Sequence, residues 1–184
     1  MKSDRPSAET LRNVPIFKRM NDSEIIQLAE IASVYQAPAG ETVVHEGKKS
    51  QRLWIVLEGE CEVFKEADGQ SGEPIVLAVL EPYSNFGEMS FFHPAPHSAS
   101  VRAKTPLTLL KIDRVDYDEL VEDGASAAAK LACNALESLS ERLRRMDEWV
   151  ADLLRHVPEP GQIDGLRTPE WSAFRNKLFT GWNL

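Results

Sequence analysis

The pattern of hydrophobic and polar residues along the chain changes twice, and each change predicts a different kind of element. Near the N-terminus, Asn21 is followed three residues later by Glu24 and then by apolar residues at helical spacing, which predicts a capped helix over 22–33. From there to residue 112 the pattern is one of short apolar runs separated by Gly, Pro and Asp. These runs predict strands at 42–45, 53–57, 61–65, 75–79, 99–103 and 107–112.

Strands at this close and even spacing are typical of an antiparallel β-barrel or jelly roll. Asp113 can cap a short helix that ends at Leu120, after which Gly124 breaks the chain. The predicted fold class is therefore mainly β with flanking helices (α+β), in which the strands form a compact cup.

The second change comes after residue 125, where apolar residues recur alternately three and four positions apart over four heptads. The resulting seam includes Leu136, Leu139, Leu143, Met146, Val150 and Leu153. This length and spacing favour a long helix that pairs with a second copy of the chain in a parallel two-stranded coil. Packing of the seam on the chain's own barrel is the alternative.

Pro158 ends the long helix, and a second, shorter helix is expected to begin at Thr168 and Pro169. Its aromatic face, with Trp171 and Phe174, either packs on its own domain or docks on another protein. The chain is thus predicted to divide into a flexible tail (1–10), a barrel domain with flanking helices (11–125), a dimerisation helix (126–157), and a linker with a short aromatic helix (158–184).

The composition narrows the classes of function. The chain has 184 residues, a net charge of −8 and a pI near 5.1, which disfavours binding to nucleic acid or to anionic membranes. It has no apolar run long enough to span a bilayer and no signal peptide, so we expect a cytoplasmic protein. The two cysteines, Cys61 and Cys133, are too few for a disulfide framework and are expected to be buried thiols.

No catalytic pattern stands out. A nucleophile elbow, a P-loop and a dinucleotide fingerprint are all missing from the sequence. Pro94 and Pro96 prevent His93 and His97 from sharing a helical face as metal ligands. We therefore expect neither an enzyme, nor a metal site, nor a bound cofactor.

The chemistry is instead expected between residues 85 and 101. Gly87 and Glu88 open a short apolar segment that Pro94 closes, which leaves room for about one helical turn. The first amides of such a turn have no partner within the helix, so they favour an anion such as phosphate. Glycine allows close approach of a ligand, and the neighbouring carboxylate can accept a hydrogen bond from a sugar hydroxyl.

At this point the sequence resembles a known family. Phe86-Gly87-Glu88, one helical turn and Pro96-His97-Ser98-Ala99 are similar to the phosphate-binding cassette of cyclic-nucleotide-binding domains, which occur in catabolite activator proteins, kinase regulatory subunits and gated channels. The resemblance implies that Glu88 binds the ribose hydroxyl and that backbone amides bind the cyclic phosphate. It implies ligand contacts with cyclic AMP or cyclic GMP from Phe86, Gly87, Glu88, Met89, His97, Ser98 and Ala99.

The resemblance also concerns the long helix, which in the activators forms the dimer interface and covers the base. Ser138 and Arg142 are the candidate base contacts. The activators carry a winged helix after this element, which needs more chain than follows Pro158. We therefore expect a stand-alone sensor domain without direct DNA binding.

Two positions depart from the family pattern. His97 stands where the nucleotide binders have an arginine, and losing one charged hydrogen bond weakens binding by about 1.5–3 kcal/mol, or roughly ten- to a hundredfold. If His97 replaces the arginine, a bound phosphate should raise its pKa, and affinity should rise as the pH falls through roughly 6.5. The second departure is Tyr83, in a turn that usually contains glycine, where it could fill part of the pocket.

Two functions follow from these observations. The first is a cyclic-nucleotide sensor that signals through a homodimeric helix. The second is a degenerate domain that no longer binds nucleotide and serves as a dimeric protein-interaction module. Binding of a different anion or metabolite in the same cup is a third alternative.

Overall fold

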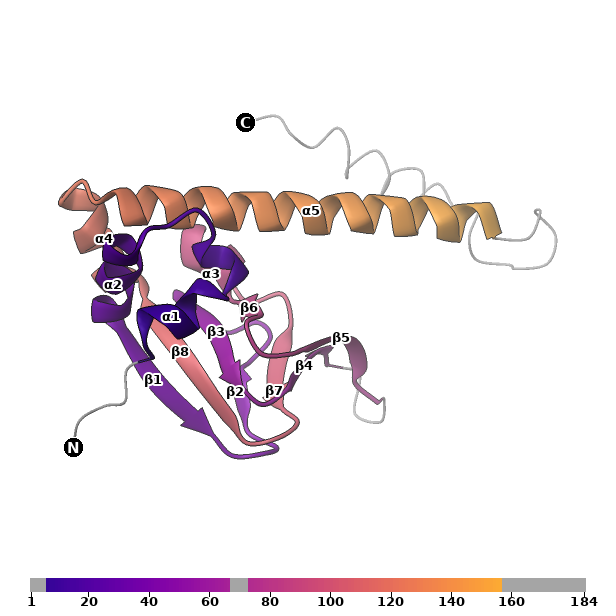
Figure 1. The fold of residues 1–184 in the computed structure, drawn as a ribbon. Coiled ribbons are helices and arrows are strands. Elements are labelled where there is room, and N and C mark those ends of the chain that lie inside the picture. Colours follow the sequence, from indigo (N-terminus) through magenta and orange to yellow (C-terminus); the bar gives the residue numbers. More distant parts are fainter. Residues whose placement is uncertain (1–5, 67–72, 157–184) are drawn as a thin grey trace. The chain divides into compact units, whose positions relative to one another are not determined.

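A computed structural model describes residues 6–66 and 73–156 of the chain (Figure 1). The chain divides into two compact units, Met1–Leu139 and Ser140–Leu184. The first unit holds every strand that the structure describes. The predicted aromatic helix and linker at 158–184, and the side chain of Leu153, lie outside the described residues.

The N-terminal helices are α1 (Ala8–Arg12), the 3-10 helix η1 (Pro15–Phe17) and α2 (Asp22–Ile31). The predicted capping box is present: Asn21 Oδ1 accepts from the Glu24 amide at 3.0 Å, and Glu24 Oε2 accepts from the Asn21 amide at 2.8 Å. This helix ends two residues before the predicted Ser33, because Ala32 has an extended backbone and begins the first strand.

The strands form two antiparallel four-stranded sheets, with the orders β1-β8-β3-β6 and β2-β7-β4-β5. The jelly-roll prediction is confirmed, but the two sheets do not join into a closed barrel. Their strands are β1 (Ala32–Ala37), β2 (Thr42–Val44), β3 (Arg52–Glu58), β4 (Cys61–Lys65), β5 (Ile75–Leu80), β6 (Asn85–Phe86), β7 (Ser100–Ala103) and β8 (Leu107–Asp113).

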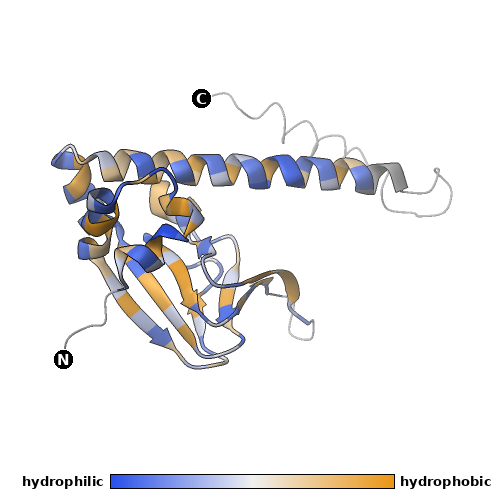
Figure 2. Ribbon diagram, in the orientation of Figure 1, coloured by the Kyte–Doolittle hydropathy of each residue, from blue (hydrophilic) through white to orange (hydrophobic). Residues whose placement is uncertain are grey.

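Alternation along β3 explains how the two sheets and the helices share one core. Leu53 and Ile55 face a cluster that includes the helical residues Leu28 and Leu131. Trp54 and Val56 face a second cluster, to which both sheets contribute. Figure 2 shows the apolar residues concentrated along these strands. The first unit is therefore a two-sheet sandwich with helices on one side of β3.

The remaining helices are α3 (Glu88–Phe92), α4 (Arg114–Glu122) and α5 (Ser126–His156). The first turns of α5 bury Ala127, Ala128, Leu131 and Ala135 in the helical core cluster. The predicted coiled-coil seam lies on other positions, where Leu136 is 66% exposed and Met146 is 54% exposed. The core of the first unit therefore uses a face of α5 different from the predicted seam.

Polar contacts also tie the start of α5 to the N-terminal helices. Glu24, which is buried, accepts hydrogen bonds from Ser126 Oγ and Lys130 Nζ, each at 2.7 Å. Asn134 Nδ2 donates to the carbonyls of Ile16 and Lys18 at 2.9 and 2.8 Å. These bonds hold the helix over its first two to three turns.

Candidate ligand-binding site

Gly87 of the predicted cassette lies between β6 and α3. This glycine has a φ of +84° and caps the N-terminus of α3. A Cβ atom built on it would lie 2.5 Å from the carbonyl oxygen of Arg52 in β3. Both the left-handed backbone and the close approach of β3 therefore require glycine here.

Glu88, the first residue of α3, has a buried carboxylate, with only 2% of the residue exposed. Asn85 Nδ2 donates to Glu88 Oε2 at 3.4 Å, so the short strand β6 and α3 position this carboxylate together. A carboxylate has about four lone-pair positions, and it can accept further bonds from a diol in addition to those from the protein.

The aromatic residues beside Gly87 form a second part of the site. Phe86 stacks on Trp54 with ring centroids 6.1 Å apart and an interplanar angle of 11°. The Cδ1 atom of Trp54 lies 3.3 Å from the position of a Cβ on Gly87. Trp54 is 4% exposed, and the described part of the chain provides no acceptor for its buried indole N–H.

The C-terminal part of the helix α3 is fixed by contacts with α4. Phe91 is fully buried and packs on Tyr117 of α4, with ring centroids 5.1 Å apart. The guanidinium of Arg114 donates to the Phe91 carbonyl at 2.8 Å. At the other end of α3, the N-cap glycine provides no side-chain hydrogen bond. The first amides of α3 are therefore oriented by the core, and their N-cap residue supplies no side-chain cap.

His97 lies in the loop between α3 and β7 and is 7% exposed. Its Nε2 is 2.7 Å from Ser50 Oγ, and its Nδ1 is 3.1 Å from Ser90 Oγ. The backbone around it is fixed as well, since its amide donates to the Lys48 carbonyl at 2.9 Å. Burial lowers the pKa of His97 below its ordinary value, so the imidazole is neutral at pH 7.

The match to a family model decides what kind of domain this is. Residues 35–123 match the model described as the cyclic nucleotide-binding domain. The chain therefore contains a domain of this family over residues 35–123.

Two known proteins are similar in sequence to this cyclic nucleotide-binding domain. The chain is 29% identical over 155 residues to a CRP-like cAMP-activated global transcriptional regulator from Mycobacterium tuberculosis. This match covers 84% of the chain and 66% of the regulator. It is 30% identical over 111 residues to a cAMP-dependent protein kinase regulatory subunit from Emericella nidulans, which covers 60% of the chain and 26% of the subunit. The chain thus spans less than two thirds of the length of either relative.

The solved structures agree with this relationship. The catabolite activator protein of Thermus thermophilus superposes with a TM-score of 0.67 at 30% identity, over 77% of the chain and 63% of that protein. The fold is therefore that of cyclic nucleotide-binding domains.

Within the domain, the predicted site residues differ in their surroundings. Phe86, Glu88 and His97 are buried, whereas Met89 is 58% exposed and Ser98 is also exposed. Gly87 and Ala99 are partly buried. On α5, Ser138 is partly buried and Arg142 is exposed, and they fall in different units of the chain, so the base contacts stay predictions.

Sequence reasoning missed Ser50 and Ser90, the two partners of the His97 ring. Ser90 follows Glu88 by two positions, but only the tertiary fold brings Ser50 from the loop before β3 to the same ring. Tyr83, the second departure from the family pattern, has a φ of +72° and so adopts the left-handed backbone that a glycine would adopt more readily.

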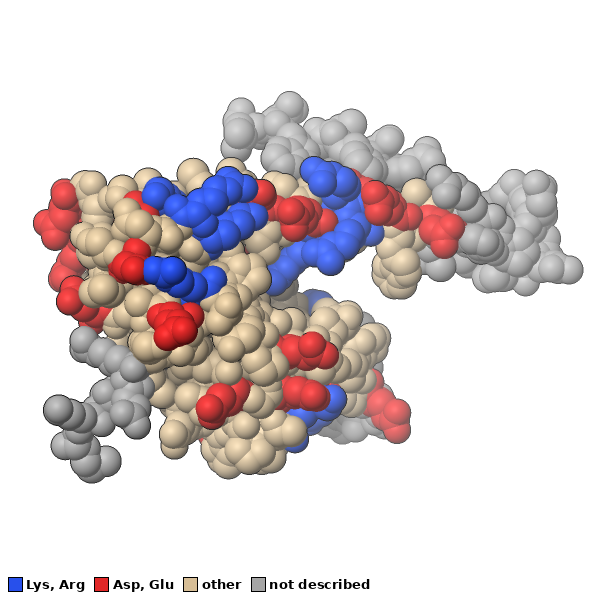
Figure 3. Space-filling view, viewed as in Figure 1, with Lys and Arg blue, Asp and Glu red and all other residues tan. Residues whose placement is uncertain are grey.

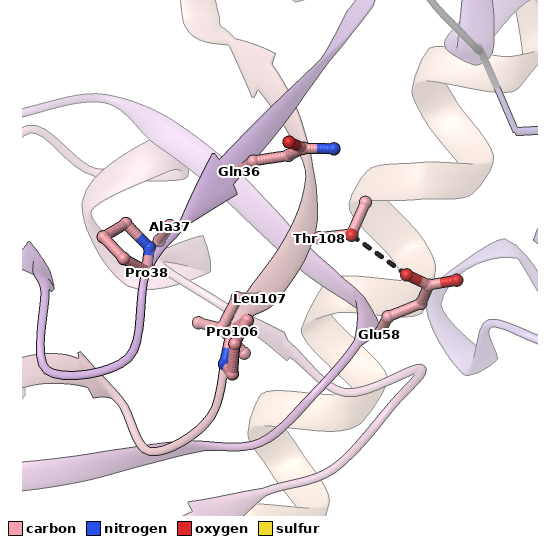
Figure 4. A pocket seen from close by; sticks show the side chains of 7 residues that line it. All are labelled: Gln36, Ala37, Pro38, Glu58, Pro106, Leu107 and Thr108. Atoms are coloured by element: carbon pink, nitrogen blue, oxygen red, sulfur yellow. Dashed lines mark hydrogen bonds between the residues drawn. The ribbon is translucent and has the colours of Figure 1, made fainter.

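A separate hollow lies where β1, β3 and β8 meet at their ends (Figure 4). Its volume is about 520 Å³, and Thr108 Oγ1 donates to Glu58 across it at 3.1 Å. Gln36, Ala37, Pro38, Pro106 and Leu107 complete its lining. No residue of the cassette contributes to this hollow, and the sequence did not predict it.

The remaining surface features bear on the predicted partners. The face shown in Figure 3 carries both basic and acidic side chains. Ion pairs between such side chains occur among the described residues, for example between Lys65 and Glu46 at 2.6 Å. Over 6–66 and 73–156, no helix is apolar enough over sufficient length to cross a bilayer, and no three acidic, His or Cys residues are placed to hold a metal. Cys61 is buried as predicted, but the prediction for Cys133 was wrong: it is exposed, because it lies away from the buried face of α5.

Proposed function

We propose that this chain is a regulatory sensor module that binds a cyclic nucleotide and signals through its long helix rather than by binding DNA. The carrying observation is the buried carboxylate of Glu88, which follows the left-handed Gly87 in a domain of the cyclic nucleotide-binding family. In this proposal Glu88 accepts hydrogen bonds from the ribose, and the uncapped first turn of α3 faces the phosphate. The named relatives, a cAMP-activated regulator and a cAMP-dependent kinase regulatory subunit, support cyclic AMP as the first ligand to test.

The output of the sensor would pass through α5. Its seam residues Leu136, Leu143 and Met146 are exposed, and their heptad spacing fits pairing with a second copy. We propose a homodimer held by this seam, together with Leu139, Val150 and Leu153. A protein partner at the aromatic segment beyond residue 158 remains part of the proposal on sequence grounds.

The test is isothermal titration calorimetry of the full chain with cyclic AMP and cyclic GMP at pH 6 and pH 8. We expect saturable binding that Glu88→Gln weakens at least tenfold, because the amide replaces one acceptor oxygen with a donor. Glu81→Gln, which changes an exposed glutamate before the cassette, is the matched control and should bind as the unmodified chain does. Saturable binding that is insensitive to Glu88→Gln would contradict the assigned site.

A second function is favoured by the surroundings of His97. Because its ring is buried between Ser50 and Ser90, it resembles a packed core residue more than a ligand contact. The alternative is therefore a dimeric protein-interaction module that has lost its nucleotide. Absence of heat with either ligand at both pH values, together with an intact dimer, would favour this alternative.

A further inference from the structure

The His97 ring is already satisfied by neutral partners. A neutral imidazole has one N–H donor and one acceptor nitrogen, and a serine hydroxyl can take either role. With Ser50 Oγ at Nε2 and Ser90 Oγ at Nδ1, both ring nitrogens have hydrogen-bond partners without a ligand. Lowering of the His97 pKa by burial is consistent with a neutral ring. In this arrangement the ring has neither a charge nor a spare donor to give to a phosphate.

The carboxylate of Glu88 increases the effect of a missing cation at position 97 on phosphate binding. Its carboxylate is buried at the start of α3, and an anionic phosphate bound near it would bring negative charge close to this buried carboxylate. An arginine in place of His97 would offset that charge with a permanent cation. The ring of His97 and the buried indole N–H of Trp54, which lies beside Gly87, carry no charge that would offset it.

We propose that this site recognises the ribose of its ligand more than the phosphate, and that it takes uncharged ribonucleosides about as well as cyclic nucleotides. The inference rests on the proposed function, because it assumes that Glu88 binds the ribose diol. In this proposal His97, whose ring is hydrogen-bonded to two serines, is the residue that sets the preference for the ribose over the phosphate.

Comparing the affinities of nucleosides and cyclic nucleotides for the unmodified full chain tests the inference directly. Dissociation constants for adenosine, guanosine, cyclic AMP and cyclic GMP are measured by calorimetry at pH 7.5. We expect each nucleoside to bind within about tenfold of its cyclic nucleotide, because the missing charged hydrogen bond is worth roughly ten- to a hundredfold. Cyclic nucleotides that bind more than a hundredfold tighter would overturn the inference and leave the proposed function standing. If neither class binds, both are wrong.

The salt dependence of cyclic-nucleotide binding tests whether another cation of the chain binds the phosphate in place of the arginine that the family has at the position of His97. The exposed Lys48, whose carbonyl accepts from the His97 amide, is one candidate. An exposed lysine is screened by salt, so a contribution from it would make cyclic-nucleotide binding weaken between 50 and 500 mM salt. We expect less than a twofold change for both ligand classes. A decrease of tenfold or more confined to the cyclic nucleotides would contradict the inference.

A variant supplies the complementary result. In His97→Arg, we expect tighter binding of the cyclic nucleotides by about ten- to a hundredfold, with the nucleosides unchanged. Since arginine in this buried position can disturb folding, Ser50→Ala is a second variant, which removes one of the bonds that hold the ring. It should leave nucleoside binding within about threefold of the unmodified chain if His97 makes no direct contact with the ligand. A tenfold loss of nucleoside affinity in a folded Ser50→Ala variant would overturn the assigned role.

Discussion

Gly87 combines two constraints that can be separated by experiment, because Gly40 shares only one of them. Both residues have a positive φ, +84° and +88°, but only at Gly87 would a Cβ collide with a backbone oxygen. We expect Gly40→Ala to reduce the free energy of unfolding by about 1–2 kcal/mol, the cost of the left-handed backbone. Gly87→Ala should cost about 1–3 kcal/mol more, because β3 must move. Urea denaturation of the two variants measures the difference, and equal losses would show that the close approach carries no cost.

The buried ring of His97 should make stability depend on pH. Its pKa in the folded chain is lowered from 6.5 by burial, so between the two values the unfolded chain binds more protons. The contribution to stability is therefore full above pH 6.5 and is lost as the pH falls below it. We expect the melting temperature to fall less steeply below pH 6.5 in His97→Gln than in the unmodified chain. The exposed His45→Gln is the matched control and should retain the original slope.

Single residues could be predicted from the sequence where their role is local. The sequence predicts two local features, each from residues no more than three positions apart: the capping pair Asn21 and Glu24, and the pair Gly87 and Glu88. The structure has the capping box and the left-handed glycine. The environment of His97 could not be predicted, because Ser50 is 47 residues away in the sequence. A family resemblance places a residue in a motif, but only the fold shows which partners fill its hydrogen bonds.

At the scale of elements, Glu24 links α2 to α5. Its pKa is lowered from 4.5 to about 2, chiefly by the hydrogen bond from Lys130, then by the Asn21 amide and Ser126. Because the folded pKa is depressed, this contribution is present above pH 4.5 and is lost as the pH falls toward 2. We expect Glu24→Gln to lower the melting temperature at pH 7 and to flatten its fall below pH 4.5. Glu30→Gln, on the exposed side of the same helix, should do neither.

The seam of α5 gives a second prediction for an element. Leu143 is exposed at a heptad position, so we expect it to be buried only when two copies pair. Leu143→Glu should weaken self-association at least tenfold, because it places a charge within the apolar interface. Arg144→Glu, one position along the helix and outside the seam, should have a much smaller effect. Sedimentation equilibrium compares the two variants, and equal dissociation constants would exclude the seam as the interface.

The elements predicted from the sequence were those with strong apolar patterns. Six of the strands that the structure describes were predicted, whereas β1 and β6 were not. β1 has the sequence Ala-Ser-Val-Tyr-Gln-Ala and is exposed at several positions, so it lacks the alternation of a half-buried strand. β6 has only two residues, Asn85 and Phe86, and owes its strand geometry to pairing with Trp54 and Ile55 of β3. Both depend on neighbours that a local pattern cannot reveal.

At the scale of the whole molecule, the sensor proposal requires that ligand binding and helix pairing be coupled. Such coupling is reciprocal: the factor by which two bound ligands tighten the dimer equals the product of the factors by which the dimer tightens each ligand. Coupling free energies of about 1–3 kcal/mol correspond to roughly 5- to 150-fold, which both measurements can resolve. A module that only binds protein through its dimer would show a factor of one.

We therefore expect a saturating ligand, cyclic AMP or adenosine, to lower the dimer dissociation constant by about 5-fold or more. At a concentration where the Leu143→Glu variant is monomeric, it should then bind the same ligand more weakly than the unmodified dimer by about the square root of that factor, because each dimer binds two ligands. Sedimentation with and without ligand gives the first number, and calorimetry on the variant and on Arg144→Glu gives the second. A ligand that binds both variants equally and leaves the dimer unchanged would show that the signal does not pass through α5, even though the cup is occupied.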